Sequence, residues 1–291
     1  MKQSKRVLVT GGSGQLGSTL KKAIQSTTET IDFVFTDSKD LDISNLESVM
    51  EYLNKADFDY CINCAGYTQV DKAEEDEEKA LFINEHGVKN LAKACHSYNT
   101  ILIHISTDFV FDGRKSSPYL ETDRPSPLGI YGLSKYKGEQ EVVRNMDRYF
   151  IIRTSWLYSE YGHNFFKSML KYGRERDQLS VVFDQIGTPT SAHDLVTAIL
   201  KIIVEEIDNY GIYHFSNEGV ASWYDFAQAI FDINGIQVDL KPIRSKEYPT
   251  PAERPSYSLL DKSKIKKVLK TQIPHWRKSL EEVSKNMGSV K

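Results

Sequence analysis

A tyrosine and a lysine four residues apart, Tyr131 and Lys135, are the residues of this sequence best suited to proton chemistry. On a helix this spacing puts both side chains on one face, one turn apart. A lysine ammonium stabilises a nearby phenolate, so we expect the pKa of Tyr131 to fall below its usual value of about 10. A phenol tuned in this way can donate or accept a proton near neutral pH. The pair alone also fits a solvated helix face, so its interpretation depends on the elements around it.

The apolar segment 101–106 is typical of a buried strand. Thr107, with its side-chain hydroxyl, follows directly after it. In an open parallel sheet, ligands bind beyond the carboxyl ends of the strands. Thr107 at such an end, followed along the chain by a helix with Tyr131 and Lys135, gives three groups that can converge on one carbonyl. A polar transition from strand to loop is the alternative, but the order of these elements favours catalysis.

A glycine-rich turn follows the first apolar segment, 7–10, and leads into an amphipathic run. Gly11, Gly14 and Gly17 have the spacing G-x-x-G-x-x-G. Glycine allows a tight turn, close approach of the backbone to a pyrophosphate, and close packing of helix on strand. The helix N-terminus favours the anion, because its free N–H groups and dipole face it. We therefore predict a dinucleotide site, in which Gln15 and Leu16 join the three glycines.

The second predicted strand, 33–36, ends at Asp37, about twenty residues after the glycines. An acid there can bond the ribose hydroxyls of NAD, whereas Lys39 could hold the 2′-phosphate of NADP, so the residues leave this choice open. Asp42 and Ile43 are expected near the adenine, although Asp42 could equally cap a helix.

The next predicted strand, 58–65, ends at small residues that we expect behind the cofactor: Ala65, Gly66 and the adjoining Tyr67. This strand contains Cys61 and Cys64 in a C-x-x-C spacing, which could indicate redox or metal chemistry. No second pair accompanies them, so we interpret them as packing cysteines.

Strand and helix patterns alternate through the first half of the chain, which predicts an α/β fold with a Rossmann-type, doubly wound parallel sheet. After Tyr149 the alternation loosens and prolines interrupt the segments. We predict an NAD(P)-binding domain over residues 1–155. Residues 156–291 are predicted to form mainly a smaller substrate-binding lobe, with some segments returning to the Rossmann sheet.

Composition narrows the class of protein. The 291 residues carry a net charge of −3, and this gives no reason to expect a nucleic-acid or membrane partner. No apolar run is long enough to span a bilayer. The three cysteines fit a reducing compartment, so we expect a cytoplasmic protein. The acidic run 71–78 is predicted to be a solvated helix start, with acids at the favourable end of the dipole.

Longer motifs extend this pattern along the chain. They are TGGSGQLG (10–17), NCAGYTQVDKAE (63–74), STDFVFDG (106–113), YGLSK (131–135), RTSW (153–156), DQIGTPT (184–190) and YPTPAERP (248–255). With them the chain resembles the extended short-chain dehydrogenases and, among these, the dTDP-4-dehydrorhamnose reductases. The glycine and Y-x-x-x-K motifs are typical of the whole superfamily, whereas the last three motifs are much more specific.

The resemblance implies reduction of the 4-keto group of dTDP-4-dehydro-6-deoxy-L-mannose to dTDP-L-rhamnose, with NADPH as cofactor and NADH as the alternative. It implies that Tyr131 donates the proton, that Lys135 lowers its pKa and bonds the nicotinamide ribose, and that Thr107 polarises the carbonyl. Asn84 is implied to fix a water or backbone near Lys135. The implied contacts to the dTDP-sugar substrate are Asp108 and Trp156 at the sugar, and Asn164, Gln185 and Arg254 at the diphosphate.

Departures from related patterns define the alternatives. Sugar 4,6-dehydratases carry Asp-Glu after the threonine, whereas here Asp108 is followed by Phe109, so reduction or epimerisation remains. The competing interpretations are a nucleotide-sugar epimerase and a non-catalytic regulatory subunit of methionine adenosyltransferase. Some of these reductases carry an acid after the glycine loop that helps bind magnesium at a dimer interface. Ser18 and Thr19 stand there instead, so we expect no metal site and leave a homodimer open.

Overall fold

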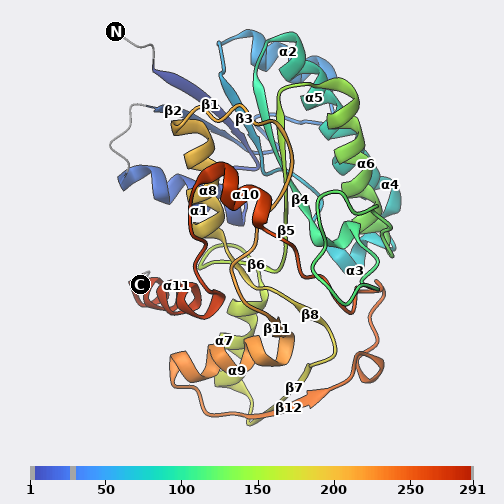
Figure 1. Ribbon diagram of the computed structural model, residues 1–291, viewed down its shortest axis with the longest axis vertical. Coiled ribbons are helices and arrows are strands. Elements are labelled where there is room, and N and C mark those ends of the chain that lie inside the picture. Colours follow the sequence, from blue (N-terminus) through green and yellow to red (C-terminus); the bar gives the residue numbers. More distant parts are fainter. Residues whose placement is uncertain (1–3, 27–30, 290–291) are drawn as a thin grey trace.

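A six-stranded parallel sheet forms the centre of the computed structural model, which describes residues 4–26 and 31–289 (Figure 1). The outermost residues of the two predicted domains, 1–3 and 290–291, lie outside the described part. The strand order is β10-β5-β4-β3-β1-β2, and every neighbouring pair is parallel. The six strands are β1 (Lys5–Thr10), β2 (Ile31–Thr36), β3 (Tyr60–Asn63), β4 (Ile101–Thr107), β5 (Tyr149–Thr154) and β10 (Gly211–His214).

Helices cover both faces of this sheet, because successive side chains of a strand point to opposite faces and both faces are apolar. In β1, Val7 and Val9 join one core cluster and Leu8 joins the other. The first face is covered by α1 (Gln15–Ala23), α8 (Ala192–Val204) and α10 (Ser263–Leu269). The second face is covered by α2 (Leu46–Asn54), α5 (Val88–Ser97) and α6 (Ile130–Asn145). The predicted α/β, doubly wound Rossmann-type fold is thereby confirmed.

The strand order reverses at β1, because β2 lies on one side of it and β3 on the other. Such a switch point opens a crevice at the carboxyl ends of the two strands, where α/β proteins bind ligands. The loops after β1, β3 and β4 all lie at this edge. Since β3 ends at Asn63, residues 64 and 65 belong to the loop rather than to the strand that the sequence predicted over 58–65.

The helical segment between β3 and β4 is divided. It consists of α4 (Glu77–Leu81), a π-helical turn η2 (Phe82–Gly87) and then α5. A Cβ on Gly87 would lie 2.8 Å from the Ile43 side chain, so glycine lets this turn approach the loop after β2. Such π turns are rare and often occur at functional sites, and this one contains Asn84. The short helix α3 (Val70–Ala73) precedes α4.

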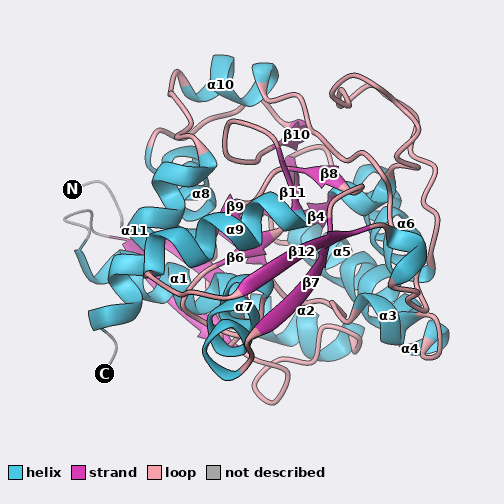
Figure 2. Cartoon of the chain, turned by 90° about the horizontal axis from the view of Figure 1, so that it is seen from below, coloured by secondary structure: helices cyan, strands magenta, loops and turns pink. Residues whose placement is uncertain are grey.

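A second group of elements lies below the sheet in Figure 1 and faces the viewer in Figure 2. It consists of α7 (Phe165–Glu175), α9 (Trp223–Asn234), α11 (Trp276–Ser289) and the parallel pair β7 (Gln178–Val182) and β12 (Asp239–Ile243). We call this part the lower lobe. A capping box between Ser222 and Asp225 begins α9, and Gly235 ends it in the left-handed conformation. The remaining elements are β6 (Leu157–Tyr158), β8 (Ile186–Gly187), β9 (Thr190–Ser191), β11 (Ala221–Ser222), η1 (Ile24–Ser26), η3 (Asp108–Val110) and η4 (Ser245–Glu247).

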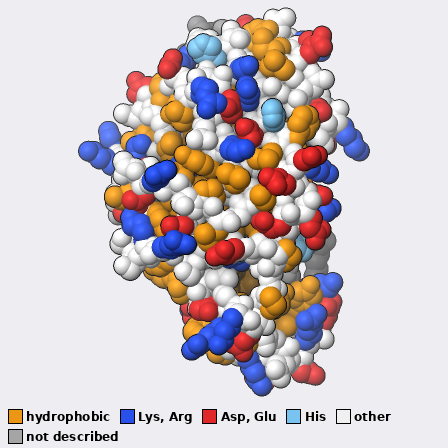
Figure 3. All heavy atoms as spheres, turned by 90° about the vertical axis from the view of Figure 1, so that its right-hand side faces the viewer, with side chains coloured by type: hydrophobic (Ala, Val, Ile, Leu, Met, Phe, Trp, Pro, Cys, Tyr) orange, Lys and Arg blue, Asp and Glu red, His pale blue; other side chains and the backbone are white. Residues whose placement is uncertain are grey.

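The C-terminal half is thus shared between the two layers. β10 pairs with β5 in the central sheet, and α8 and α10 pack on that sheet. Among the described residues, no helix is both long and apolar enough to cross a membrane. On the face drawn in Figure 3, basic and acidic side chains are interspersed with apolar ones.

Candidate active site

The carboxyl end of β4 and the first turns of α6 bring the three predicted catalytic residues together. Thr107 ends β4, and Tyr131 and Lys135 lie one turn apart on α6. The Tyr131 hydroxyl is hydrogen-bonded to the Thr107 side chain. A Cβ on Gly132 would lie 2.2 Å from the Phe109 carbonyl oxygen, so glycine lets α6 approach the segment after β4 closely.

The pKa of Tyr131 differs from the expectation. Burial raises the pKa of Tyr131 to about 12, although the bond with Thr107 opposes this. The Lys135 ammonium donates instead to the Ile105 carbonyl oxygen, at 2.5 Å. The predicted lowering of this pKa by Lys135 is therefore wrong, because burial and the nearby Asp108 carboxyl raise it. Burial also lowers the pKa of Lys135, to about 8.

A buried ion pair supports this region from behind. Arg153 on β5 donates from Nε and Nη2 to the two carboxylate oxygens of Glu139 on α6, at 2.9 and 2.6 Å. Both side chains are at most 2% exposed. The Ser106 hydroxyl donates to the same carboxylate at 2.5 Å. The pair thus ties β4, β5 and α6 together next to the catalytic residues, and sequence reasoning missed it because its partners lie on separate elements.

Glycines shape the loop between β1 and α1, as predicted for a dinucleotide site. Gly11 has φ +66°, and a Cβ there would lie 2.7 Å from the Ala65 nitrogen. The backbone of the loop after β3 therefore touches this turn. Gly14 precedes α1 without any side-chain cap, so the first N–H groups of the helix are left for an anion. The Leu16 side chain is buried in the core, and only its backbone can face a ligand.

Gly17→Ala is expected to weaken NADPH binding about 10-fold or more, since overpacking a tight site costs about 1–3 kcal/mol. The added Cβ would lie 2.5 Å from the Gly11 carbonyl oxygen and 2.7 Å from the Gly12 Cα. The turn must shift to relieve this contact. Fluorescence titration of NADPH measures the effect, with Ser18→Ala on the same helix as a control. Unchanged affinity in the glycine variant would contradict this role of the turn.

A polar row across three strands fixes the loop after β3. Thr10, Asn63 and His104 are aligned on β1, β3 and β4. The side-chain oxygen Oδ1 of Asn63 accepts from the Thr10 hydroxyl at 2.7 Å and from the Ala65 nitrogen at 3.1 Å. This row holds Ala65 against the glycine turn. A Cβ on Gly66 would lie 3.9 Å from the Lys135 Nζ, so Gly66 lies beside the catalytic lysine.

Asn84 fixes backbone next to the site, as the resemblance implied. It is buried, and its side chain accepts from the Tyr67 nitrogen at 2.8 Å and donates to the Tyr67 carbonyl oxygen at 3.0 Å. It also donates to the Ser134 hydroxyl at 2.9 Å, one residue before Lys135. The Tyr67 hydroxyl donates to Asp76 at 3.0 Å.

Cys61 and Cys95 are buried in the core nearby, and Cys64 is partly exposed.

The predicted adenosine residues lie after β2. Asp37 accepts from the Lys39 nitrogen at 2.8 Å, and the Lys39 side chain is exposed. Asp42 accepts from the nitrogen and the hydroxyl of Ser44, while Asn45 caps α2. Asp42 therefore stabilises a turn, and its contact with adenine stays a prediction. Ile43 is buried against η2.

The two residues predicted to contact the sugar differ in their surroundings. Asp108 is buried, which raises its pKa to about 6, and its Oδ2 has no hydrogen-bond partner among the described residues. Trp156 has φ +48° and stacks on Trp223, with ring centroids 3.6 Å apart. Trp223 thus covers one face of Trp156. It also donates from its indole N–H to Gln185 at 3.2 Å, and Gln185 donates to Ser245 at 3.0 Å.

All three residues predicted at the diphosphate, including Gln185, are engaged by protein groups. Asn164 caps α7 and donates to the Gln15 side chain at 2.7 Å, which links the lower lobe to the glycine turn. Arg254 donates to both carboxylate oxygens of Asp71, at 2.9 and 2.7 Å. The structure does not bring Asn164, Gln185 and Arg254 into contact with one another, and their substrate roles stay predictions.

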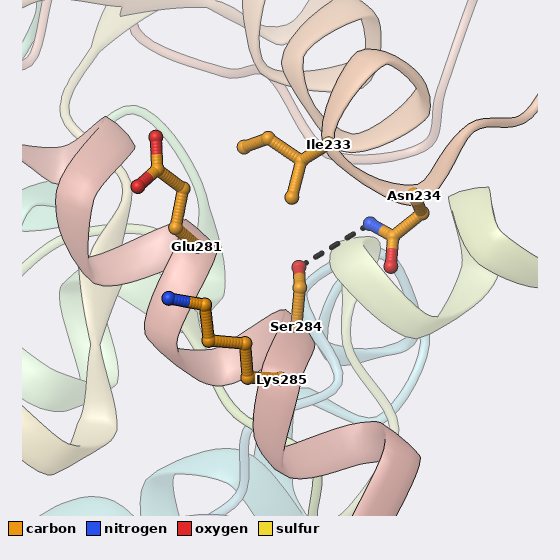
Figure 4. Close-up of a pocket in the computed structure, with 5 residues that line it drawn as sticks. All are labelled: Ile233, Asn234, Glu281, Ser284 and Lys285. Atoms are coloured by element: carbon orange, nitrogen blue, oxygen red, sulfur yellow. Dashed lines mark hydrogen bonds between the residues drawn. The ribbon is translucent and has the colours of Figure 1, made fainter.

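A separate pocket of about 420 Å³ lies between α9 and α11 (Figure 4). It is lined by Ile233, Asn234, Glu281, Ser284 and Lys285, none of which is a predicted site residue. Across the described ranges 4–26 and 31–289, no group of three or more His, Cys, Asp or Glu side chains is arranged to hold a metal ion.

Comparison with known proteins identifies the family. The model of the RmlD substrate binding domain matches residues 5–289. A dTDP-4-dehydrorhamnose reductase of Aggregatibacter actinomycetemcomitans is 41% identical, over 96% of this chain and 98% of its own. The crystal structure of a dTDP-4-dehydrorhamnose reductase from Bacillus anthracis, in complex with NADP, is 40% identical with a TM-score of 0.94, covering 98% of this chain and 100% of that one. A dTDP-4-dehydrorhamnose reductase structure from Clostridium acetobutylicum has a TM-score of 0.92 at 40% identity, covering 97% and 99%. With such likeness over nearly its whole length, the chain belongs to the dTDP-4-dehydrorhamnose reductase family.

Proposed function

We propose that this chain reduces the 4-keto group of dTDP-4-dehydro-6-deoxy-L-mannose to dTDP-L-rhamnose with NADPH. The observation that carries this proposal is the meeting of Thr107, Tyr131 and Lys135 at the carboxyl edge of the sheet, beside the glycine turn. Its relatives are named for this reduction, and one was solved with NADP. Complete, hydrogen-bonded catalytic residues favour an enzyme over a non-catalytic regulatory subunit.

The residues at this edge of the sheet fit a dinucleotide. The turn at Gly11, Gly14 and Gly17 would take the pyrophosphate at the N-terminus of α1. Gly66 and Lys135 would lie at the nicotinamide end, because the two residues are adjacent and at the same sheet edge as Thr107. Bound NADPH supplies a hydride to carbon 4 of the sugar.

The protein supplies the proton. With its pKa at about 12, Tyr131 is fully protonated at neutral pH and can donate from its hydroxyl. The alkoxide that develops on the sugar is a stronger base than a phenolate, so the transfer is favourable. Lys135, one turn along the helix, then stabilises the phenolate by its charge. The hydroxyl of Thr107 donates to Asp108 Oδ1 at 3.1 Å in the structure and would turn to donate to the carbonyl oxygen and polarise it, as an oxyanion-hole group does.

Asp108 and Trp156 would bind the sugar. The Oδ2 of Asp108 is a buried acceptor without a partner among the described residues, which suits a sugar hydroxyl. Trp156, which is partly exposed, would offer an apolar surface and an N–H donor for a 6-deoxy sugar. Asn164, Gln185 and Arg254 would bind the diphosphate end. A homodimer of this chain stays a prediction.

Lys39→Ala is expected to weaken NADPH binding about 10-fold and to leave NADH binding nearly unchanged, because the lysine is the cation beside the expected 2′-phosphate. The Lys39 side chain is exposed after β2, next to Asp37. Dissociation constants of both cofactors, measured in parallel, test this. An equal loss of affinity for NADH and NADPH would show that Lys39 does not select for the 2′-phosphate.

The function itself is tested by mixing the protein with the keto sugar nucleotide and NADPH. We expect loss of the absorbance of reduced nicotinamide and formation of dTDP-L-rhamnose in equal amounts. Interconversion of sugar epimers without cofactor consumption would favour the epimerase instead.

A further inference from the structure

Two acids of the run 71–78, Asp71 and Glu74, make specific contacts with segments far along the chain. Asp71 lies on α3, and Glu74 follows directly after it. Their spacing of three residues puts both carboxylates on one side of this turn. In Figure 1, α3 lies beside the lower end of α6. The sequence interpretation of a solvated helix start therefore misses what these two residues do.

Asp71 holds Arg254 in a two-pronged contact. The guanidinium Nη1 and Nη2 donate to the two carboxylate oxygens at 2.9 and 2.7 Å, and Nη1 also donates to the Thr250 hydroxyl at 2.6 Å. The Ala252 nitrogen donates to the same carboxylate at 3.3 Å. The bond from Arg254 holds the pKa of Asp71 below its usual range, so Asp71 stays ionised at neutral pH. The segment of Arg254 is thus fixed to α3 through its side chain and its backbone.

Glu74 caps the helix that carries the catalytic residues. The N-cap position of α6 is Gly129, which has no side chain to accept from the first helical N–H groups. The Glu74 carboxylate accepts from the Ile130 nitrogen instead, at 2.8 Å. A Cβ on Gly129 would lie 2.5 Å from this carboxylate oxygen, so glycine admits the cap. Tyr131 is the next residue after the capped amide.

We propose that Asp71 and Glu74 are positioning residues that hold the two halves of the substrate site in register. Glu74 fixes the first turn of α6, and with it Tyr131. Asp71 fixes the guanidinium of Arg254 for a diphosphate, since a guanidinium has five N–H donors and keeps some for a second anion. This inference rests on the proposed function, because it assigns Arg254 to the substrate diphosphate.

Loss of Asp71 and loss of Glu74 should change different kinetic constants. The Asp71 side chain is 43% exposed, and pairs of that kind contribute little to fold stability. Loss of Asp71 should therefore free Arg254 without unfolding the chain, which weakens ground-state binding of the substrate. Loss of Glu74 should displace the proton donor, which slows the chemical step.

Steady-state kinetics of four variants test the proposal. We expect Asp71→Ala to raise KM for the sugar nucleotide about 10-fold with kcat nearly unchanged. We expect Glu74→Ala to lower kcat about 10-fold with KM nearly unchanged. Glu74→Gln should restore most of kcat, because its side-chain oxygen can still accept from Ile130. Glu75→Ala, the same loss of charge at an exposed neighbour, should behave as wild type.

The outcomes distinguish this inference from the function on which it rests. If the wild-type protein fails to reduce the keto sugar nucleotide, the proposed function is wrong. If the wild type is active and Asp71→Ala and Glu74→Ala lower kcat and raise KM in the same proportion, or change neither, the positioning roles are wrong. If Glu74→Ala is too unstable to assay, Glu74→Gln decides. An amide oxygen can replace the carboxylate oxygen as the acceptor, so a kcat of Glu74→Gln as low as that of Tyr131→Phe would show that Glu74 does not act as a cap.

Discussion

Tyr131→Phe should reduce kcat by about 10²–10⁴-fold, the usual worth of a positioned general acid. The change removes the hydroxyl that is hydrogen-bonded to Thr107 and leaves the ring in contact with Phe109, whose centroid is 5.7 Å away. The fold and the glycine turn should be unaffected. NADPH binding, measured by fluorescence titration, should therefore persist while turnover is lost.

Tyr136→Phe is the matched control for this variant. Tyr136 lies on the same helix but packs against the cluster of Val110, Phe111 and Tyr119. It should keep nearly normal turnover, because its hydroxyl is not part of the catalytic group. Near-normal turnover in Tyr131→Phe itself would exclude this tyrosine as the proton donor.

Arg153→Met should lower the free energy of unfolding by about 3–5 kcal/mol, the usual cost of removing one partner of a buried ion pair. The change leaves the Glu139 carboxylate in the core with only the Ser106 hydroxyl as a donor. It also removes the guanidinium that lies 5.1 Å above the Phe111 ring. Urea unfolding followed by circular dichroism measures the loss.

A double variant separates the buried charge from lost packing. Glu139→Leu combined with Arg153→Met removes both charges, and apolar replacements of a buried pair are often nearly neutral. We expect the double variant to be more stable than Arg153→Met alone. If the free energy of unfolding of Arg153→Met lies within about 1 kcal/mol of the wild-type value, Arg153 and Glu139 do not form the buried ion pair that the structure describes.

The parts of the site that the sequence predicted are those set by local rules. The glycine turn depends on residues within a few positions of one another, and Gly11 does adopt a positive φ there. Tyr131 and Lys135 share a helix turn, as their spacing requires. Parallel strands then bring Thr107 to the same edge. These features need only the period of each element and the order of the strands.

The parts that it missed depend on tertiary contacts. The partner of Asp71 lies 183 residues away, so the acidic run alone could not reveal it. The pKa of Tyr131 rises because of burial, which the neighbouring lysine does not indicate. Trp223 and Trp156 are 67 positions apart in the sequence, and only the folded lower lobe stacks them. The π turn at Asn84 likewise interrupts a helix whose sequence pattern continues through it.

Transfer of label from NADPH deuterated at the nicotinamide C4 is the measurement that tests the central claim most directly. The wild-type protein is incubated with the labelled cofactor and dTDP-4-dehydro-6-deoxy-L-mannose, and the product is examined by NMR and mass spectrometry. The account predicts dTDP-L-rhamnose with one deuterium at C4 of the sugar, and no such product from Tyr131→Phe on the same time scale. Unlabelled sugar, or a product altered at another carbon, would contradict it.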